Sequence, residues 1–445
     1  MTEVLPRDIL LRVGGRTLHR TGFLAAMGAG RGYVEVKETF GRADGVTPVA
    51  TFIDRDLSIR TAAADKLRIE YPPALAGLLD FAGLPYCGPL LEGPGANRWQ
   101  FSDDQTNAAW LSNGLTSVIG GDPDPDGGNT ACHTVENVAN TSHIVGQNFP
   151  AATDNTRQSV TWHAAKKERT WAVIRSFPKD GVAKFSYVNL ATGAKGTIDA
   201  SHDISVSGLL KNGFYRITMS FDAKAGGSTP SAWIGGATGD LGIIFVGDGA
   251  SGIYVWRGQF EKDVAIASSP IKTPGAGVVT RAADNLTVPV FWGPMDCTIL
   301  TRIYRPVWAD AGAAVDLLLP PTAFQLGDNA TPNIRGGGVQ AARSWYGYID
   351  TAGADSNQTA AIPAGLEQVT LRQYKNLAAA AGGQVALDVG AGLGGFAAAA
   401  TQFFTFGNQI MAIGRGTVGQ ELYGVILDHI VARGLRTLGE MLAIK

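Results

Sequence analysis

The chain has 445 residues, a formal net charge of −2, 45% hydrophobic residues and only 17% charged residues. This length predicts two or three domains. The balanced charge excludes a nucleic-acid-binding protein and a polybasic membrane-surface protein, because neither partner would meet the positive field that it requires. The 58 glycines favour many tight turns between short strands, because glycine adopts φ > 0 without strain.

The cysteines and the apolar segments exclude further classes. Cys87, Cys132 and Cys297 are far apart and form no CxxC pair, which predicts buried thiols rather than a disulfide framework or a zinc site. The first residues have no basic region followed by a long apolar run, so we expect no secretory signal. We expect the protein to be synthesised in the cytoplasm. Glycines and Asp388 interrupt the longest low-charge region, residues 376–406, so we expect no membrane insertion.

The N-terminal part of the chain reads as β-rich. Within residues 1–60, Ile9–Val13 and Tyr33–Lys37 have the pattern of strands. Two interpretations stay open for this region: a segment that docks onto a larger assembly, or a small β-rich domain without a separate role. Residues 61–98 follow as an extended connector, because prolines at 72, 73 and 89 oppose helix formation.

Residues 99–267 have the pattern of a β-sandwich. Short strands alternate with turn signals at the spacing of an all-β fold, as in residues 161–164, 171–175, 185–188 and 215–221. Trp110 is the expected core residue near its start. The strand at 252–261 places apolar groups on both faces, with Ile253, Val255 and Gln259 on one and Tyr254, Trp256 and Phe260 on the other. Gly258 breaks the period and predicts a bulge.

A Ser-, Pro- and Gly-containing linker, residues 268–284, precedes a second predicted sandwich at 285–445. Its predicted strands are residues 297–305, 369–374, 384–389, 411–414 and 425–431. Leu435, Leu438 and Met441 then have the spacing of a short amphipathic helix.

Two stretches resemble bacteriophage structural proteins. Residues 248–284, DGASGIYVWRGQFEKDVAIASSPIKTPGAGVVTRAAD, resemble the end of a carbohydrate-module-like jelly-roll domain found in many of them, with Pro270 where those proteins have Tyr. Residues 42–98 resemble their leader by the order of short motifs, namely Arg42-Ala43-Asp44, Ile59-Arg60-Thr61-Ala62-Ala63, Arg68 with Tyr71, Leu90-Leu91-Glu92 and Asn97. The end of the chain, from Leu422, resembles the close of concanavalin-like laminin-G domains.

These resemblances imply an all-β protein with two consecutive antiparallel sandwiches, one jelly-roll and one concanavalin-like, after a β-rich N-terminal attachment region. They imply a head or tail fibre or spike on the virion surface. Its partners would be other virion proteins, bound through residues 1–60, and host-surface polysaccharide. We expect a homo-oligomer, most simply a trimer, because tethered copies of a weak site raise its effective concentration.

One local motif predicts either a calcium site or a solvated turn. Asp122, Asp124 and Asp126 alternate before a glycine, as in the start of a calcium loop. The interleaved prolines restrict the chain, and His133 occupies the twelfth position where such loops carry a bidentate Glu. Both interpretations stay open; no other cofactor is expected.

Catalytic motifs are missing from the sequence. It contains no HExxH, G-x-S-x-G or P-loop motif. The Glu-x-Asp-x-x-Glu strand of concanavalin-like hydrolases is also absent, and glycoside hydrolysis needs two carboxylates that converge in space. We therefore predict a protein that is not an enzyme.

Aromatic side chains are the remaining candidates for a ligand site. Trp345 lies opposite Tyr346 and Tyr348 on a predicted strand, and Trp233 stands next to Gly235 and Gly236. Exposed aromatic rings suit sugar rings, whereas core packing is the alternative for each. The sequence thus predicts non-catalytic binding of host-surface glycans; the alternatives are a purely structural decoration or joining protein of the virion and a polysaccharide depolymerase.

Overall fold

A computed structural model describes residues 50–62, 68–78, 88–149, 152–264 and 267–291 continuously. Elsewhere it describes strand segments alone, at 9–13, 23–27, 33–36, 39–41, 297–304, 322–326, 333–337, 344–350, 356–361, 367–376, 383–388, 408–413 and 424–433. The described strands pair antiparallel in extended sheets, which confirms the predicted all-β class. The helical turns of this part are the 3-10 segments η2 (Pro73–Leu75) and η3 (Lys211–Gly213), and no helix in it could span a membrane.

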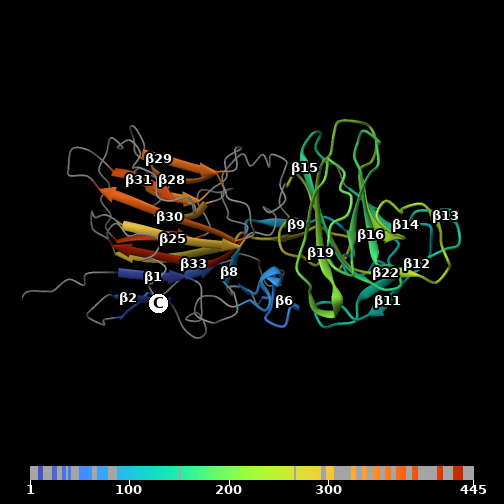
Figure 1. Ribbon diagram of the computed structural model, residues 1–445, viewed down its shortest axis with the longest axis horizontal. Helices are drawn as coiled ribbons and strands as arrows, with labels where there is room; N and C mark the ends of the chain where they lie inside the picture. The colour runs from blue at the N-terminus through green and yellow to red at the C-terminus, as the bar shows by residue number, and fades with distance from the viewer. Residues whose placement is uncertain are drawn as a thin grey trace, which may run out of the picture.

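Two sheets form the first sandwich, which contains the central part of the chain (Figure 1). The five-stranded sheet has the order β10 (Leu111–Asn113), β14 (His143–Asn148), β20 (Ser231–Ala237), β16 (Trp171–Phe177) and β17 (Lys184–Asn189). The six-stranded sheet has the order β11 (Leu115–Asp122), β12 (Ala131–Glu136), β22 (Gly252–Glu261), β15 (Arg157–Lys166), β19 (Tyr215–Asp222) and β18 (Asp203–Val206).

Aromatic rings fill the space between these two sheets. The rings of Trp99 and Trp162 have centroids 5.3 Å apart, and those of Phe149 and Phe260 stack at 4.0 Å. The expected core residue Trp110 lies edge-on to Trp99 at 5.3 Å. Such pairs add about 0.5–1.5 kcal/mol each beyond the area that they bury, so this cluster is a principal source of the sandwich's stability.

Strand β22 confirms the predicted bulge and corrects the predicted faces. Thr161 of β15 pairs with Gln259, but His163 pairs with Trp256, so one residue of β15 opposes two of β22. Because a bulge shifts the alternation by one residue, Phe260 lies in the core with Ile253 and Val255 rather than on the opposite face. The assignment of Phe260 and Gln259 was therefore wrong.

The second sandwich combines strands from both ends of the chain. A nine-stranded sheet contains β3 (Tyr33–Val36), β2 (Phe23–Met27), β1 (Ile9–Val13), β33 (Gly424–Arg433), β25 (Cys297–Tyr304), β30 (Glu367–Asn376) and β31 (Gly383–Asp388) in this order, with β7 (Ile69–Glu70) and β8 (Gly88–Leu91) beside them. A seven-stranded sheet has the order β29 (Ser356–Ala361), β28 (Ser344–Asp350), β27 (Asn333–Gly337), β26 (Thr322–Leu326), β32 (Asn408–Ile413), β24 (Asn285–Phe291) and β4 (Thr39–Gly41).

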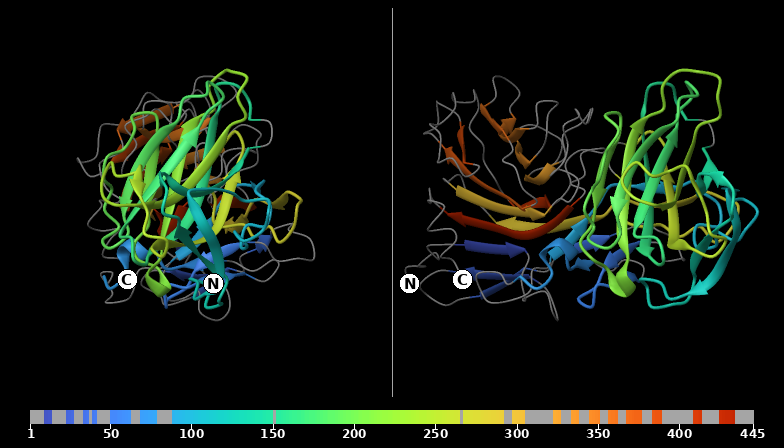
Figure 2. Two further views of the ribbon diagram at one scale, coloured as in Figure 1. Left: turned by 90° about the vertical axis from the view of Figure 1, so that its right-hand side faces the viewer. Right: turned by 45° about the vertical axis from the view of Figure 1, so that its right-hand side comes forward.

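This pairing corrects the predicted separation of residues 1–60 from residues 285–445. Strand β1 pairs with β33, and β4 pairs with β24, so N-terminal strands complete the C-terminal sheets. In Figures 1 and 2 the blue and the orange-red strands accordingly lie together at one end, with the green first sandwich at the other. The first sandwich is thus an insertion between two parts of the second. The predicted strands at 297–305, 369–374, 384–389, 411–414 and 425–431 fall on β25, β30, β31, β32 and β33.

Three short pairs complete the described strands: β5 (Thr51–Ile53) with β6 (Ile59–Thr61), β9 (Gly95–Asn97) with β23 (Val279–Arg281), and β13 (Asn140–Thr141) with β21 (Phe245–Val246). Cys132 is a free, buried thiol as predicted, and burial raises its pKa to about 11. Cys87 lies outside the described residues, and so does the helix predicted around Leu435.

Candidate functional site

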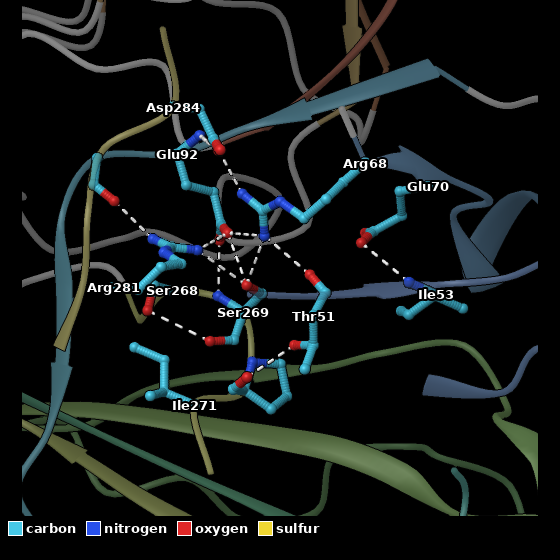
Figure 3. Close-up of polar contacts among 12 residues, drawn as sticks. Thr51, Ile53, Arg68, Glu70, Glu92, Ser268, Ser269, Ile271, Arg281 and Asp284 are labelled. Carbon is cyan, nitrogen blue, oxygen red and sulfur yellow. Dashed lines mark hydrogen bonds and ion pairs between the residues drawn. The ribbon is translucent and has the colours of Figure 1, made fainter. Parts of the chain in front are cut away.

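A buried network of charged side chains joins the two sandwiches (Figure 3). This junction network consists of Arg68, Glu92, Ser269, Arg281 and Asp284. The Arg68 guanidinium lies 2.7 Å from the Glu92 carboxylate and also contacts Asp284, while Glu92 pairs with Arg281 and accepts hydrogen bonds from the Ser269 amide at 2.6 Å and hydroxyl at 2.7 Å. Both arginine side chains are fully buried. No ligand could reach these groups, so the network is structural.

The motifs that resemble phage proteins converge on this junction. Asn97, from the leader, donates to the carbonyls of Gly258 at 3.0 Å and Ile271 at 2.8 Å. Its side-chain oxygen accepts from the amide of Phe260 at 3.1 Å. The predicted connector at 61–98 and linker at 268–284 are therefore not simple spacers, because their polar residues pair with one another across the end of the first sandwich. Sequence order alone gave no sign of this pairing.

Glu70 is a titratable group next to the junction network. Its carboxylate accepts a hydrogen bond from the Ile53 amide at 3.3 Å. Burial, followed by repulsion from Glu92, raises the pKa of Glu70 to about 7, although Arg216 and Arg68 oppose the shift. The buried Tyr304 of β25 experiences the Glu70 charge as well, and burial and that charge raise its own pKa. Glu70 thus changes its charge near neutral pH.

The aspartate-rich loop is organised as a turn. Asp124 is fully buried and accepts hydrogen bonds from the amides of Asp126 at 3.1 Å, Gly128 at 2.8 Å and Thr130 at 2.8 Å. The Thr130 hydroxyl donates to the same carboxylate at 2.7 Å. Asp126 pairs with Arg257 at 3.3 Å.

The third carboxylate of the motif does not complete a metal site. Asp122 ends strand β11, where it pairs with Ala131. Among the residues that the structure describes, no group of three or more His, Cys, Asp and Glu side chains is arranged to hold a metal ion. Of the two interpretations, the contacts favour the turn over the calcium site at Asp122, Asp124 and Asp126.

The two predicted glycan-binding groups, the aromatic residues around Trp345 and the single residue Trp233, differ in how much the structure says about them. Trp345, Tyr346 and Tyr348 do lie on a strand, β28, which pairs with β27 and β29 inside the seven-stranded sheet. Their side chains lie outside the described part of the structure. The sequence-based prediction for these residues therefore stays a prediction.

Trp233 lies on the outer face of the five-stranded sheet and remains partly exposed. Its ring occupies the space above Gly146 on the neighbouring strand, since a Cβ at Gly146 would lie 2.8 Å from the ring atom Cδ2. The indole nitrogen donates to the Ser231 hydroxyl at 2.8 Å. The glycine and the hydrogen bond together hold the ring across the strands.

The register places further large side chains in the same row. Directly opposite residues of antiparallel strands point to the same face. Leu111 of β10 pairs with Gly146, Trp233 of β20 pairs with Arg175 of β16, and Arg175 pairs with Phe185 of β17. With Phe177, two residues further along β16, these side chains form what we call the outer face, namely Leu111, Arg175, Phe177, Phe185 and Trp233; none of them is fully buried.

Loops close one end of this face. The Asp240 carboxylate accepts hydrogen bonds from the Thr197 amide at 2.8 Å and hydroxyl at 3.0 Å, which ties two loops together. Trp171 packs beneath Gly196, and Tyr187 is buried. The open part of the sheet is therefore the row around Trp233 and Arg175, where an aromatic surface and a cation lie side by side.

Sequence reasoning found Trp233 but missed Arg175 and Phe185. The strand at 171–177 carries large residues in both phases, with Ala172 and Ile174 in the core and Arg175 and Phe177 outside. The outer face also has a small buried cluster of its own, and Trp233 and Phe185 pack against its edge; its members are Ile144, Val173, Tyr187 and Ala237. Bulky groups that remain partly exposed beside such a cluster are a usable signal for a ligand surface.

A buried serine and histidine come nearest to catalytic geometry within the described residues. Nε2 of His202 lies 2.7 Å from the Ser176 hydroxyl, and Nδ1 lies 2.8 Å from that of Ser186. Burial lowers the pKa of His202 to about 4, so this imidazole is a weak base at neutral pH. Both serines are fully buried, and the arrangement is a satisfied core hydrogen-bond network.

Comparisons with known proteins give little beyond the fold. No protein-family model and no curated protein matches the chain. Among solved structures, domains LG4-5 of the mouse laminin alpha1 chain are similar over 68% of this chain and 89% of that one, with 11% identity and a TM-score of 0.23. A likeness at this level carries no conclusion about function, and the all-β class rests on the observed strand pairing.

Proposed function

We propose that this protein binds glycans without catalysis and that the outer face of the first sandwich is the binding surface. The observation that carries the proposal is the Trp233 ring, held across Gly146 and partly open to solvent. Rings in this position stack on the apolar faces of sugars, while neighbouring polar groups bond the hydroxyls. The exposed Asn148 lies on this face next to Ser231 and supplies such a group.

The setting that we propose is a phage virion, as a head or tail fibre or spike at the virion surface. This part of the proposal rests on the sequence resemblance of residues 42–98 and 248–284. Docking to other virion proteins through residues 1–60 and assembly into a trimer belong to the same proposal. Because β1 and β4 belong to the second sandwich, such docking would use the surface of that sandwich rather than a separate arm.

A structural decoration protein is the second candidate, favoured by one observation. Four large apolar side chains in strand β21 and in the loops near the β13–β21 pair are 60–70% exposed, namely Val138, Leu241, Ile244 and Val246. This apolar tip lies at the end of the molecule away from the second sandwich (Figure 1). Exposed apolar groups gathered in this way are typical of protein contacts.

The test measures binding of the full-length protein to host-surface polysaccharide by isothermal titration calorimetry. Trp233→Ala should abolish binding while circular dichroism shows that the protein stays folded, whereas Val246→Asp, at the apolar tip, should leave binding unchanged. If wild-type protein binds no polysaccharide and Val246→Asp prevents its incorporation into particles, the structural role replaces the proposed one.

A further inference from the structure

Arg175 places a positive charge in the centre of the outer face. Its guanidinium carbon lies 5.2 Å from the centre of the Phe177 ring and 5.9 Å from that of the Trp233 ring. The strand register adds Phe185 on its other side. Arginine stacks on aromatic rings in this way while its planar fork stays available for hydrogen bonds.

No carboxylate among the residues that the structure describes balances the charge of Arg175. Within the described residues, the structure gives this side chain no ion pair and no hydrogen bond, and its Nε atom is buried without a partner. Burial alone lowers its pKa. Three other arginines of the first sandwich form ion pairs: Arg157 with Asp203 and Asp222, Arg169 with Glu136, and Arg257 with Asp103. Arg216 of β19 donates instead to the Ser268 carbonyl.

An unpaired, partly desolvated guanidinium is costly unless a ligand supplies the missing anion. Aromatic rings compensate only a part of that cost. A carboxylate matches the guanidinium fork with two parallel hydrogen bonds. The adjacent Trp233 ring is suited to the sugar that carries such a group.

Given glycan binding at the outer face, as proposed above, we infer that the ligand is an acidic saccharide, whose pyranose ring stacks on Trp233 while its carboxylate pairs with Arg175. The chemical class is a uronic or sialic acid within a polysaccharide. A neutral glycan would stack on the Trp233 ring but would leave the Arg175 guanidinium without an anion.

The test compares polysaccharides that differ only in their charge. Full-length protein is titrated with polygalacturonate, alginate and polysialic acid, each beside its carboxyl-reduced form. We expect at least one acidic polymer to bind about 10- to 100-fold more tightly than its reduced form, as for the loss of charged hydrogen bonds. Arg175→Gln should remove this preference, and Arg175→Lys should remove most of it because lysine lacks the fork.

Controls separate this inference from glycan binding in general. Arg157→Gln, which removes a paired arginine elsewhere in the sandwich, should leave the preference intact. Equal binding of acidic and reduced polymers, both lost in Trp233→Ala, would overturn the acidic ligand and retain the glycan site. Absence of binding to any polymer would overturn both. Arg175→Gln should also keep the thermal midpoint; a drop in the midpoint with unchanged binding would assign Arg175 a structural role instead.

Discussion

Replacement of Arg68 by Met should strongly destabilise the protein. The guanidinium is fully buried and contacts Glu92 at 2.7 Å, Ser269 at 2.8 Å, the Thr51 carbonyl at 2.8 Å and Asp284. The two arginines and two carboxylates of the junction network balance, so the variant leaves one buried negative charge in excess. Removing one partner of a buried pair costs about 3–5 kcal/mol, a large fraction of the roughly 5–15 kcal/mol that stabilises a typical domain.

Urea unfolding followed by circular dichroism measures this loss. Arg60→Met is the matched control, because Arg60 pairs with Asp54 and Asp56 on the surface and is 43% exposed; such exposed pairs contribute about 0–1 kcal/mol. In the double variant Arg68→Met/Asp284→Asn the loss should be smaller than the sum of the single losses by about 1–3 kcal/mol. If Arg68→Met costs no more than Arg60→Met, the junction network does not join the sandwiches as we describe.

Three further predictions concern charge, packing and metal binding. Glu70→Gln should raise the free energy of unfolding at pH 8 by about 1–3 kcal/mol but should leave it unchanged at pH 5. The carboxyl pKa of about 7 in the folded protein lies above the value of about 4.5 in the unfolded chain, so the wild-type protein loses stability as the pH rises from about 4.5 to 7, and the neutral Gln avoids this loss. Equal effects at both pH values would contradict this prediction. Gly258→Ala should destabilise by about 1–3 kcal/mol in urea unfolding, since its Cβ would lie 2.4 Å from the Trp110 ring, whereas Gly227→Ala, in open space, should change little. Millimolar calcium should not shift the thermal midpoint, because protein donors already occupy Asp124; a rise abolished by Asp124→Asn would restore the calcium site.

Local pattern predicted the strands but not their partners. The alternation at 252–261 and the glycine at 258 were sufficient to predict strand β22 and its bulge. They were not sufficient to place Phe260, because the bulge reverses the phase of everything that follows it. The pairing of β1 with β33 joins opposite ends of the chain, and no local pattern carries that information.

In the candidate site, too, local sequence indicates single residues but not the contacts that strand pairing gives them. Trp233 is visible as an aromatic residue beside glycines, but the role of Gly146 depends on strand pairing across 87 positions of sequence. Arg175 matters because no carboxylate faces it within the described structure, and the sequence cannot reveal the absence of a partner. Likewise, Arg68 and Asp284 belong to recognisable sequence motifs, yet their contact joins residues 216 positions apart.

A crystal structure of the full-length protein with a bound acidic oligosaccharide tests the central claim most directly. We expect density for a sugar ring on Trp233 with its carboxylate facing Arg175. Density at Trp345 and Tyr346 on β28, with none on the outer face, would contradict the account and move the glycan site to the second sandwich.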